Sequence, residues 1–134
     1  MKRINAHKKP KALAGIKKGS TEAEIIAELF HAIDSAIRIE RLYADQYLQR
    51  QDICDQFGIN RHKLNDILAI HANGQSFPQY INSFRLAEAL KMLRERPGMN
   101  ISAIAAAVGF TPANLREQFK QQYGVTPVAY RQKL

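Results

Sequence analysis

Asn65 and Arg116 are of the two residue types that pair most specifically with bases in the major groove of DNA. An asparagine amide makes two hydrogen bonds to adenine, and an arginine guanidinium makes two to guanine. Each contact of this kind discriminates against the wrong base by roughly 1 to 3 kcal/mol. Such a role requires helices that present both side chains to a groove, so the surrounding sequence has to supply those helices.

Each of these two residues lies on a polar helix face opposite an apolar one. In the first segment, Leu64, Ile67 and Leu68 are expected to face inward. The candidate base contacts are His62, Asn65 and Asp66 in the first segment, and Ala113, Asn114, Arg116 and Glu117 in the second. The candidate phosphate contacts, which position a protein without specifying sequence, are Arg61, Lys63, Arg85 and Lys120.

Two acidic residues, Asp66 and Glu117, occupy equivalent positions on these faces, where a phosphate backbone would repel them. Either each carboxylate accepts a hydrogen bond from a cytosine amino group, or Asp66 pairs with His62 one turn earlier while Glu117 stays in solvent. The second interpretation is favoured.

The elements around these faces form an internal repeat with an offset of 51 residues, in which Arg50 to Ala69 aligns with Ile101 to Lys120. The aligned pairs are Ile53 with Ile104, Cys54 with Ala105, Phe57 with Val108, Gly58 with Gly109, Asn60 with Thr111, Leu64 with Leu115, and Leu68 with Phe119. Each copy predicts a short helix, a glycine turn, a capping Asn or Thr, and a second helix. The small Cys54 or Ala105 lets the second helix cross closely, so each copy is expected to be a helix-turn-helix.

Three further helices are expected around the repeat. An opening helix of about twenty residues follows Ser20 as its N-cap, with apolar Ile26, Phe30, Ile33 and Ile37. This stripe could pack on its own chain, which is favoured, or pair with a second copy. Residues 43–48 are expected to be a polar break.

A long linker helix is expected from Phe77 to about Glu95, capped by Ser76 and ended by Pro97 and Gly98. At 1.5 Å per residue it spans roughly 28 Å, comparable with one turn of DNA at about 34 Å. A last short helix is capped by Thr126 and opened by Pro127.

The charge is concentrated at the two ends of the chain. The net charge is +8 over 134 residues, and residues 1–20 contain seven Lys or Arg and no acid. Residues 21–49 are acidic, whereas residues 72–134 are basic. We expect a polyanionic partner, nucleic acid first and an anionic membrane surface second. The alternative for residues 1–20 is a solvated, flexible basic tail.

Catalysis and metal binding are not expected. The single Cys54 fills an inward position where a thiol packs inertly, and one Cys with four scattered His has no metal-ligand spacing. No glycine-rich phosphate loop, secretory signal or 18-residue apolar run is present. No enzyme activity or cofactor is therefore expected, and a reducing cytoplasm suits the lone thiol.

Three motifs then carry a resemblance: QSFPQYINSFRLAEA in the linker helix, NISAIAAAVGF in the second repeat, and GVTPVAYR near the end. From about residue 42 onward the chain resembles the DNA-binding domain of AraC/XylS-type bacterial transcription regulators. The resemblance implies an all-α, seven-helix domain over residues 21–134. It places the first helix-turn-helix at about 50–70, the linker helix at about 77–95 and the second helix-turn-helix at about 101–122.

The resemblance also implies a function: a regulator, commonly an activator, that binds double-stranded DNA in two successive major grooves and touches RNA polymerase. We expect a monomer on DNA, with a dimer through residues 22–44 as the alternative, and no small-molecule effector domain in this chain. Two rival functions stay open. One is a protein interaction module that docks through residues 22–44, and the other is the cytoplasmic end of a larger, membrane-tethered regulator whose tail binds anionic lipid.

Overall fold

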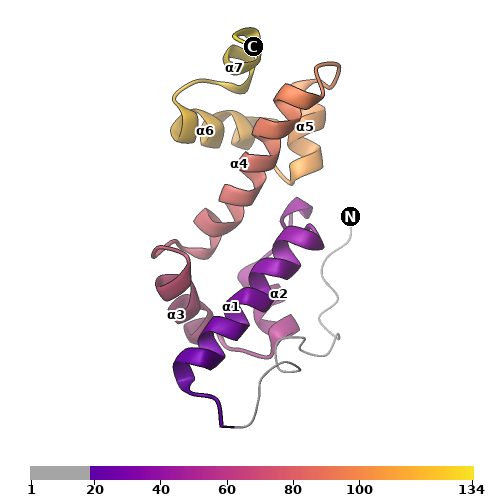
Figure 1. The fold of residues 1–134 in the computed structure, drawn as a ribbon. Coiled ribbons are helices and arrows are strands. Elements are labelled where there is room, and N and C mark those ends of the chain that lie inside the picture. Colours follow the sequence, from indigo (N-terminus) through magenta and orange to yellow (C-terminus); the bar gives the residue numbers. More distant parts are fainter. Residues whose placement is uncertain (1–18) are drawn as a thin grey trace. The chain divides into compact units, whose positions relative to one another are not determined.

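The computed structural model describes residues 19–134 and contains seven α-helices and one short 3₁₀ helix in that range (Figure 1). They are α1 (Glu22–Ile39), η2 (Leu42–Ala44), α2 (Arg50–Phe57), α3 (Arg61–His71), α4 (Phe77–Glu95), α5 (Ile101–Val108), α6 (Pro112–Tyr123) and α7 (Pro127–Gln132). No strand occurs in residues 19–134. The predicted all-α, seven-helix fold is therefore confirmed. The predicted basic tail, except for its last two residues, lies outside the described range.

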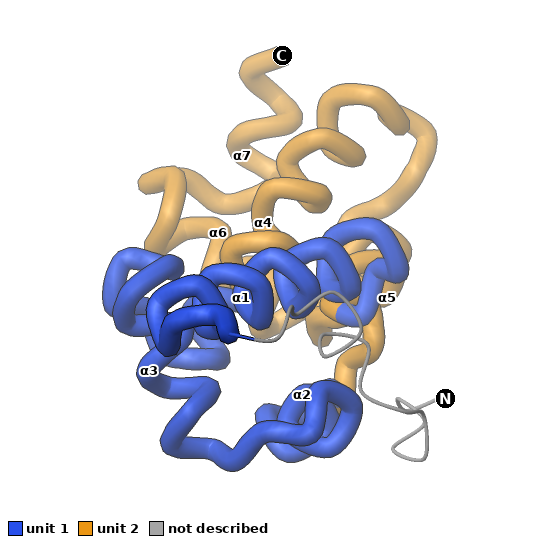
Figure 2. Tube along the Cα trace, turned by 60° about the horizontal axis from the view of Figure 1, so that its bottom comes forward, with its two compact units in different colours: residues 1–42, 48–80 blue, residues 43–47, 81–134 orange. Residues whose placement is uncertain are grey.

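The helices form two compact units (Figure 2). Of the described residues, unit 1 contains those up to residue 42 and residues 48–80, and unit 2 contains residues 43–47 and 81–134. Helix α4 is continuous from Phe77 to Glu95, so its first turn belongs to unit 1 and the remainder to unit 2. Each unit contains one copy of the sequence repeat.

Helix α1 begins one residue later than its predicted cap. Thr21, not Ser20, is the N-cap: its hydroxyl accepts from the Glu24 N–H at 3.2 Å, and its own N–H donates to the Glu24 carboxylate at 3.0 Å. This reciprocal capping box satisfies two N–H groups at once, which a cap at Ser20 could not do because a box needs Glu or Gln three residues on. The cap hydrogen bonds hold the pKa of Glu24 below its usual value.

The core of unit 1 is made by one face each of α1, α2 and α3. The α1 stripe is buried against its own chain, as favoured from the sequence: Ile33 and Ile37 are fully buried, while Phe30 is partly exposed and stacks on His71 with ring centroids 5.2 Å apart. The remaining buried apolar residues of this unit include Leu29, Ile53, Phe57, Leu64, Ile67 and Leu68.

The core of unit 2 lies between α4, α5 and α6. Its buried cluster consists of Leu86, Ala89, Met92, Leu93, Ile104, Ala105, Val108, Phe110, Leu115 and Phe119. Helix α7 closes this unit, because Arg131 on it donates to the backbone carbonyl oxygens of Leu93 at 3.4 Å and Arg96 at 3.1 Å. These carbonyls lie at and just after the C-terminal end of α4, so one side chain on α7 caps α4.

The segment predicted as a polar break, residues 43–48, is partly structured and partly apolar. Tyr43 lies in η2, is buried, and stacks on Phe84 with ring centroids 6.1 Å apart. The prediction of a polar break was wrong at this residue, because the packing partner of Tyr43 lies 41 residues further along the chain.

Candidate nucleic-acid interface

The turn between α2 and α3 has the form predicted for a helix-turn-helix. Gly58 adopts a left-handed conformation with φ of 67°, and the N–H of Ile59 donates back to the carbonyl oxygen of Cys54 at 3.1 Å. Asn60 then caps α3, because its side-chain oxygen accepts from the Lys63 N–H at 2.7 Å. These bonds end one helix and start the next within three residues.

The turn between α5 and α6 repeats this arrangement at an offset of 51 residues. Gly109 has φ of 91°, the N–H of Phe110 donates to the Ala105 carbonyl oxygen at 2.9 Å, and the Thr111 hydroxyl accepts from the Asn114 N–H at 3.1 Å. Every one of these residues is the repeat partner of a residue in the first turn. The two copies therefore share backbone geometry as well as sequence pattern.

The small residues at the two helix crossings are fully buried. Cys54 is 1% exposed and Ala105 is 0% exposed. Burial raises the pKa of the Cys54 thiol, with the Asp55 carboxylate adding to the effect, so the reactive thiolate is disfavoured. The Cys54 side chain thus serves packing, in agreement with the sequence-based interpretation.

The predicted reading face of α3 is exposed. Leu64, Ile67 and Leu68 are buried, and the opposite face presents Arg61, His62, Asn65, Asp66 and Ala69 to solvent. The Nε2 atom of His62 lies 3.5 Å from a carboxylate oxygen of Asp66. This is the contact that the favoured interpretation of Asp66 requires. The neighbouring Asn65 amide makes no hydrogen bond within residues 19–134.

The predicted reading face of α6 is exposed in the same way. Leu115 and Phe119 are buried, and Ala113, Asn114, Arg116, Glu117 and Lys120 are solvent-exposed. Arg116 makes no hydrogen bond or ion pair with the described residues. Its guanidinium is therefore available to a partner molecule.

The four predicted phosphate contacts differ in whether their charged groups are free to bind a phosphate. Arg61 and Lys120 are exposed, but the ammonium of Lys63 pairs with the Glu22 carboxylate in the first turn of α1. Lys63 is only 27% exposed. Phosphate binding by Lys63 would therefore compete with this ion pair.

Arg85 is a correction to the prediction. It is 9% exposed, and its guanidinium donates from Nε to the Tyr43 carbonyl oxygen at 2.7 Å and from Nη2 to the Asp45 carbonyl oxygen at 2.9 Å. The same group lies 5.5 Å from the centroid of the Phe110 ring. A guanidinium engaged on both sides inside unit 2 has no path to a phosphate, so Arg85 is a structural residue.

Sequence reasoning missed residues that border both reading faces. In unit 1, a hollow of about 390 Å³ adjoins Asn65 and Ala69 and is also lined by Arg50, Gly74, Gln75, Ser76, Phe77 and Gln79. Arg50 is the first residue of α2 and is partly exposed. Its repeat partner is the apolar Ile101, so a comparison of the two copies gave no signal for a cation at this place.

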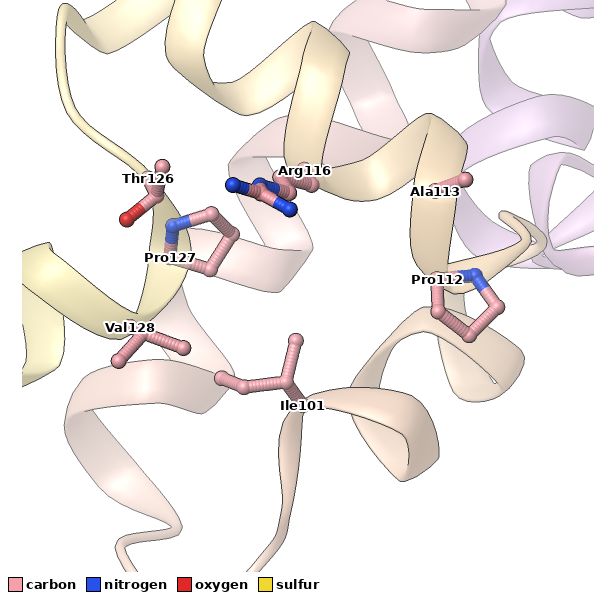
Figure 3. Close-up of a pocket in the computed structure, with 7 residues that line it drawn as sticks. All are labelled: Ile101, Pro112, Ala113, Arg116, Thr126, Pro127 and Val128. Atoms are coloured by element: carbon pink, nitrogen blue, oxygen red, sulfur yellow. The ribbon is translucent and has the colours of Figure 1, made fainter.

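In unit 2, a hollow of about 360 Å³ adjoins the start of the reading helix (Figure 3). The first residues of α5, α6 and α7 line it, together with Arg116 from α6 (Figure 3). The lining is Ile101, Pro112, Ala113, Arg116, Thr126, Pro127 and Val128. Val128 is 50% exposed, and no sequence signal separated it from an ordinary surface valine.

The described residues hold no group of three or more His, Cys, Asp or Glu side chains that could bind a metal ion. Within the same residues, no helix has the length and apolar character needed to cross a membrane.

Comparison with known proteins places these features in a family. The helix-turn-helix domain family matches residues 53–133, which is more than half of the chain. The activator RhaR of Pectobacterium carotovorum is 30% identical over 104 residues, covering 77% of this chain. The uncharacterised transcriptional regulatory protein YesN of Bacillus subtilis is 36% identical over 62 residues, covering 45% of this chain. The chain spans 36% of RhaR and 17% of YesN.

Solved structures share the fold. The DNA-binding domain of AdpA, solved in complex with a target DNA, has a TM-score of 0.68 at 19% identity, covering 78% of this chain and 90% of that one. The C-terminal domain of AraT, a response regulator from Geobacillus stearothermophilus, has a TM-score of 0.67 at 20% identity, covering 86% and 89%.

Two helix-turn-helix copies with exposed second helices define the class of helix-turn-helix transcription regulators that bind DNA. Within that class, this chain belongs to the AraC-type helix-turn-helix family, as its sequence motifs predicted.

Proposed function

We propose that this chain binds double-stranded DNA in a sequence-specific way through α3 and α6 and thereby regulates transcription. The observation that carries the proposal is the repeated turn. Two segments 51 residues apart use equivalent hydrogen bonds to project a second helix whose outer face is polar and exposed. That projection is what a helix-turn-helix needs to insert its second helix into a major groove.

The exposed side chains divide between base reading and backbone positioning. Asn65 is assigned to adenine and Arg116 to guanine, because both are exposed and their side chains match these bases bidentately. His62, Asp66, Ala113, Asn114 and Glu117 flank them as further base contacts. Arg61, Lys120 and the newly found Arg50 are assigned to phosphate, while Lys63 would first have to leave Glu22.

The two units are assigned to half-sites about one helical turn apart on one duplex. Helix α4 connects them and has 19 residues, or roughly 28 Å at 1.5 Å per residue. This length is of the order of the 34 Å repeat of DNA, so one chain could span two successive major grooves. The apolar stripe of α1 is buried within its own chain, which supports a monomer on DNA over a dimer through residues 22–44.

Activation through contact with RNA polymerase is part of the proposal. RhaR is named a transcriptional activator, and this chain spans 36% of it. A protein that binds the bacterial chromosome acts in the cytoplasm, where polymerase is also found. Expressing the chain in cells that carry a reporter gene with the selected site upstream of its promoter should raise transcription of that reporter. Reduced transcription of the reporter would argue for a repressor instead.

Selection of bound duplexes from a random pool tests the DNA-binding proposal. The wild-type chain is expected to enrich a motif with two half-sites about ten base pairs apart. Asn65→Ala should lose preference at positions in one half-site, and Arg116→Ala should lose it at positions in the other. Each loss corresponds to roughly 1 to 3 kcal/mol of discrimination.

The control for lost charge is Lys91→Ala, an exposed lysine on α4 outside both reading faces. This variant should enrich the wild-type motif with all positions intact. Identical motifs from Asn65→Ala, Arg116→Ala and the wild type would refute the assigned contacts.

A further inference from the structure

One short segment of the chain lies in a different unit from its neighbours on both sides. Residues 43–47, here called the crossing segment, belong to unit 2, whereas residue 42 and residue 48 belong to unit 1. The chain therefore passes between the units three times, twice around the crossing segment and once within α4 between Tyr80 and Ile81. Helix α4 is therefore not the only place where the chain passes from one unit to the other.

The crossing segment is held in unit 2 by Arg85. Its guanidinium bridges two backbone carbonyl oxygens of the segment, those of Tyr43 at 2.7 Å and Asp45 at 2.9 Å. Arg85 itself is buried, with only 9% of its surface exposed. Hydrogen bonds from a charged donor to carbonyls are about twice as strong as neutral ones, and removing a buried donor leaves both acceptors unsatisfied.

The segment is also held by its own side chains. The Tyr43 ring stacks on Phe84, the residue before Arg85, with centroids 6.1 Å apart. Within the segment, the Tyr47 N–H donates to an Asp45 carboxylate oxygen at 2.8 Å, so this bond shapes the segment itself. The crossing segment is thus tied to the rest of unit 2 at Tyr43 and at the Asp45 carbonyl.

The same guanidinium touches the turn of the second helix-turn-helix. It lies 5.5 Å from the Phe110 ring centroid, and a Cβ on Gly109 would lie 3.0 Å from the Arg85 Nε and 2.5 Å from the Tyr43 carbonyl oxygen. The turn that projects α6 and the segment that leads into α2 therefore meet at one side chain. Without a glycine at position 109 the two backbones could not approach this closely.

We propose that Arg85 is a positioning residue that ties the crossing segment to the turn before α6, and that this second tie makes the chain selective for the spacing between its two DNA half-sites. This inference rests on the proposed function. With both connections in place, fewer arrangements of the two reading helices should be accessible than with α4 alone. With the tie released, α4 is the only connection left, and a wider range of half-site spacings becomes accessible.

The spacing dependence of DNA binding tests this inference. The probe is the duplex selected by the wild-type chain, with one base pair inserted or deleted between the half-sites, which turns one half-site by about 34° relative to the other. The wild-type affinity should fall at least about tenfold for either change. Arg85→Met should bind all three duplexes within about threefold of one another, with unchanged affinity for an isolated half-site. Arg85→Lys keeps the charge, but its single nitrogen cannot take the places of both Nε and Nη2, so its spacing dependence should be intermediate.

The matched control is Arg131→Met. Arg131 is another arginine of unit 2 that donates to several backbone carbonyls, but none of them is in the crossing segment. This variant should weaken unit 2 while keeping the wild-type spacing dependence. An unchanged spacing profile in Arg85→Met, or an equally relaxed profile in Arg131→Met, overturns the inference.

A measurement without DNA separates this inference from the proposed function. Amide hydrogen exchange in residues 43–47 should be at least about tenfold faster in Arg85→Met than in the wild type, intermediate in Arg85→Lys, and unchanged in Arg131→Met. If the wild-type chain selects no duplex, the proposed function fails, and the exchange result still judges the tie. Equal exchange rates for residues 43–47 in the wild type and the three variants would contradict the tie made by Arg85.

Discussion

Gly109 faces the backbone carbonyl oxygen of Tyr43 so closely that a Cβ at position 109 would lie 2.5 Å from it. Gly109 also has a φ of +91°, a conformation that other residues adopt only at a cost. Space and backbone conformation both require glycine here. The turn before α6 is therefore specified by a contact with a segment more than sixty residues earlier, in addition to its local sequence.

Gly109→Ala should destabilise the chain more than the left-handed backbone alone explains. Gly124→Ala is the matched control, because Gly124 has φ of +79° with open space around its Cβ position. We expect Gly124→Ala to cost about 1 kcal/mol and Gly109→Ala to cost about 3 kcal/mol or more. Urea unfolding of both variants checks this, and equal losses would show that the Tyr43 contact contributes nothing.

Tyr80→Phe should destabilise unit 1 by about 1 to 2 kcal/mol. The Tyr80 hydroxyl donates to the Asp34 carboxylate at 2.7 Å, and the ring is buried at the start of α4. Burial and the Asp34 carboxylate together raise the pKa of Tyr80 far above its usual value, so the hydroxyl stays protonated as a donor. Thermal unfolding measures the loss.

The control for the Tyr80 prediction is Tyr123→Phe, whose hydroxyl has no hydrogen bond to the described residues. Its unfolding temperature should stay near that of the wild type. A drop equal to that of Tyr80→Phe would mean that the Asp34 hydrogen bond is not the cause.

Cys54 should be protected from alkylation in the folded chain. Its thiol should also make the free energy of unfolding fall at alkaline pH. Burial raises the thiol pKa above its unfolded value, so the folded state keeps a proton that the unfolded state releases. This contribution is fully present below a pH of about 8.5, the usual thiol pKa, and is lost as the pH rises through the folded value. Iodoacetamide labelling at pH 8, with and without denaturant, measures the protection. Labelling at the same rate in both conditions would contradict it.

Residues 1–18 should add to DNA affinity without adding to sequence preference. They contain seven Lys and Arg and no acid, and lie outside the described residues. Each phosphate contact that is lost on their removal should reduce the slope of log affinity against log salt concentration by about 0.9. A salt titration of the full chain and of residues 19–134 measures this slope; a slope that does not change assigns these residues no phosphate contact.

The local features of the interface could be predicted from the sequence because their causes are local. Gly58 and Gly109, with Asn60 and Thr111 two residues later, determine each turn through bonds that span at most five residues. The 51-residue repeat places the same residue types at equivalent positions twice, so both turns carry the same local signal. The exposed faces of α3 and α6 followed from the same helical periodicity.

The role of Arg85 could not be predicted, because its carbonyl partners are 40 and 42 residues away and belong to the backbone, where the sequence carries no residue signal. From the sequence alone, an arginine on a helix in the basic half of the chain fits a phosphate contact as well as a structural role. The burial of Arg85 decides between the two. The hollow beside Asn65 was missed for the same reason, since Arg50 and Gln75 meet only through the fold.

The specificity ratio is the most direct test of the claim that α3 and α6 read DNA sequence. It is the affinity of the full wild-type chain for its selected duplex divided by its affinity for a scrambled duplex of equal composition and length, at one fixed salt concentration. If α3 and α6 read the sequence, this ratio should be about 10³ or more. A ratio near one, with binding that depends on salt alone, would contradict it.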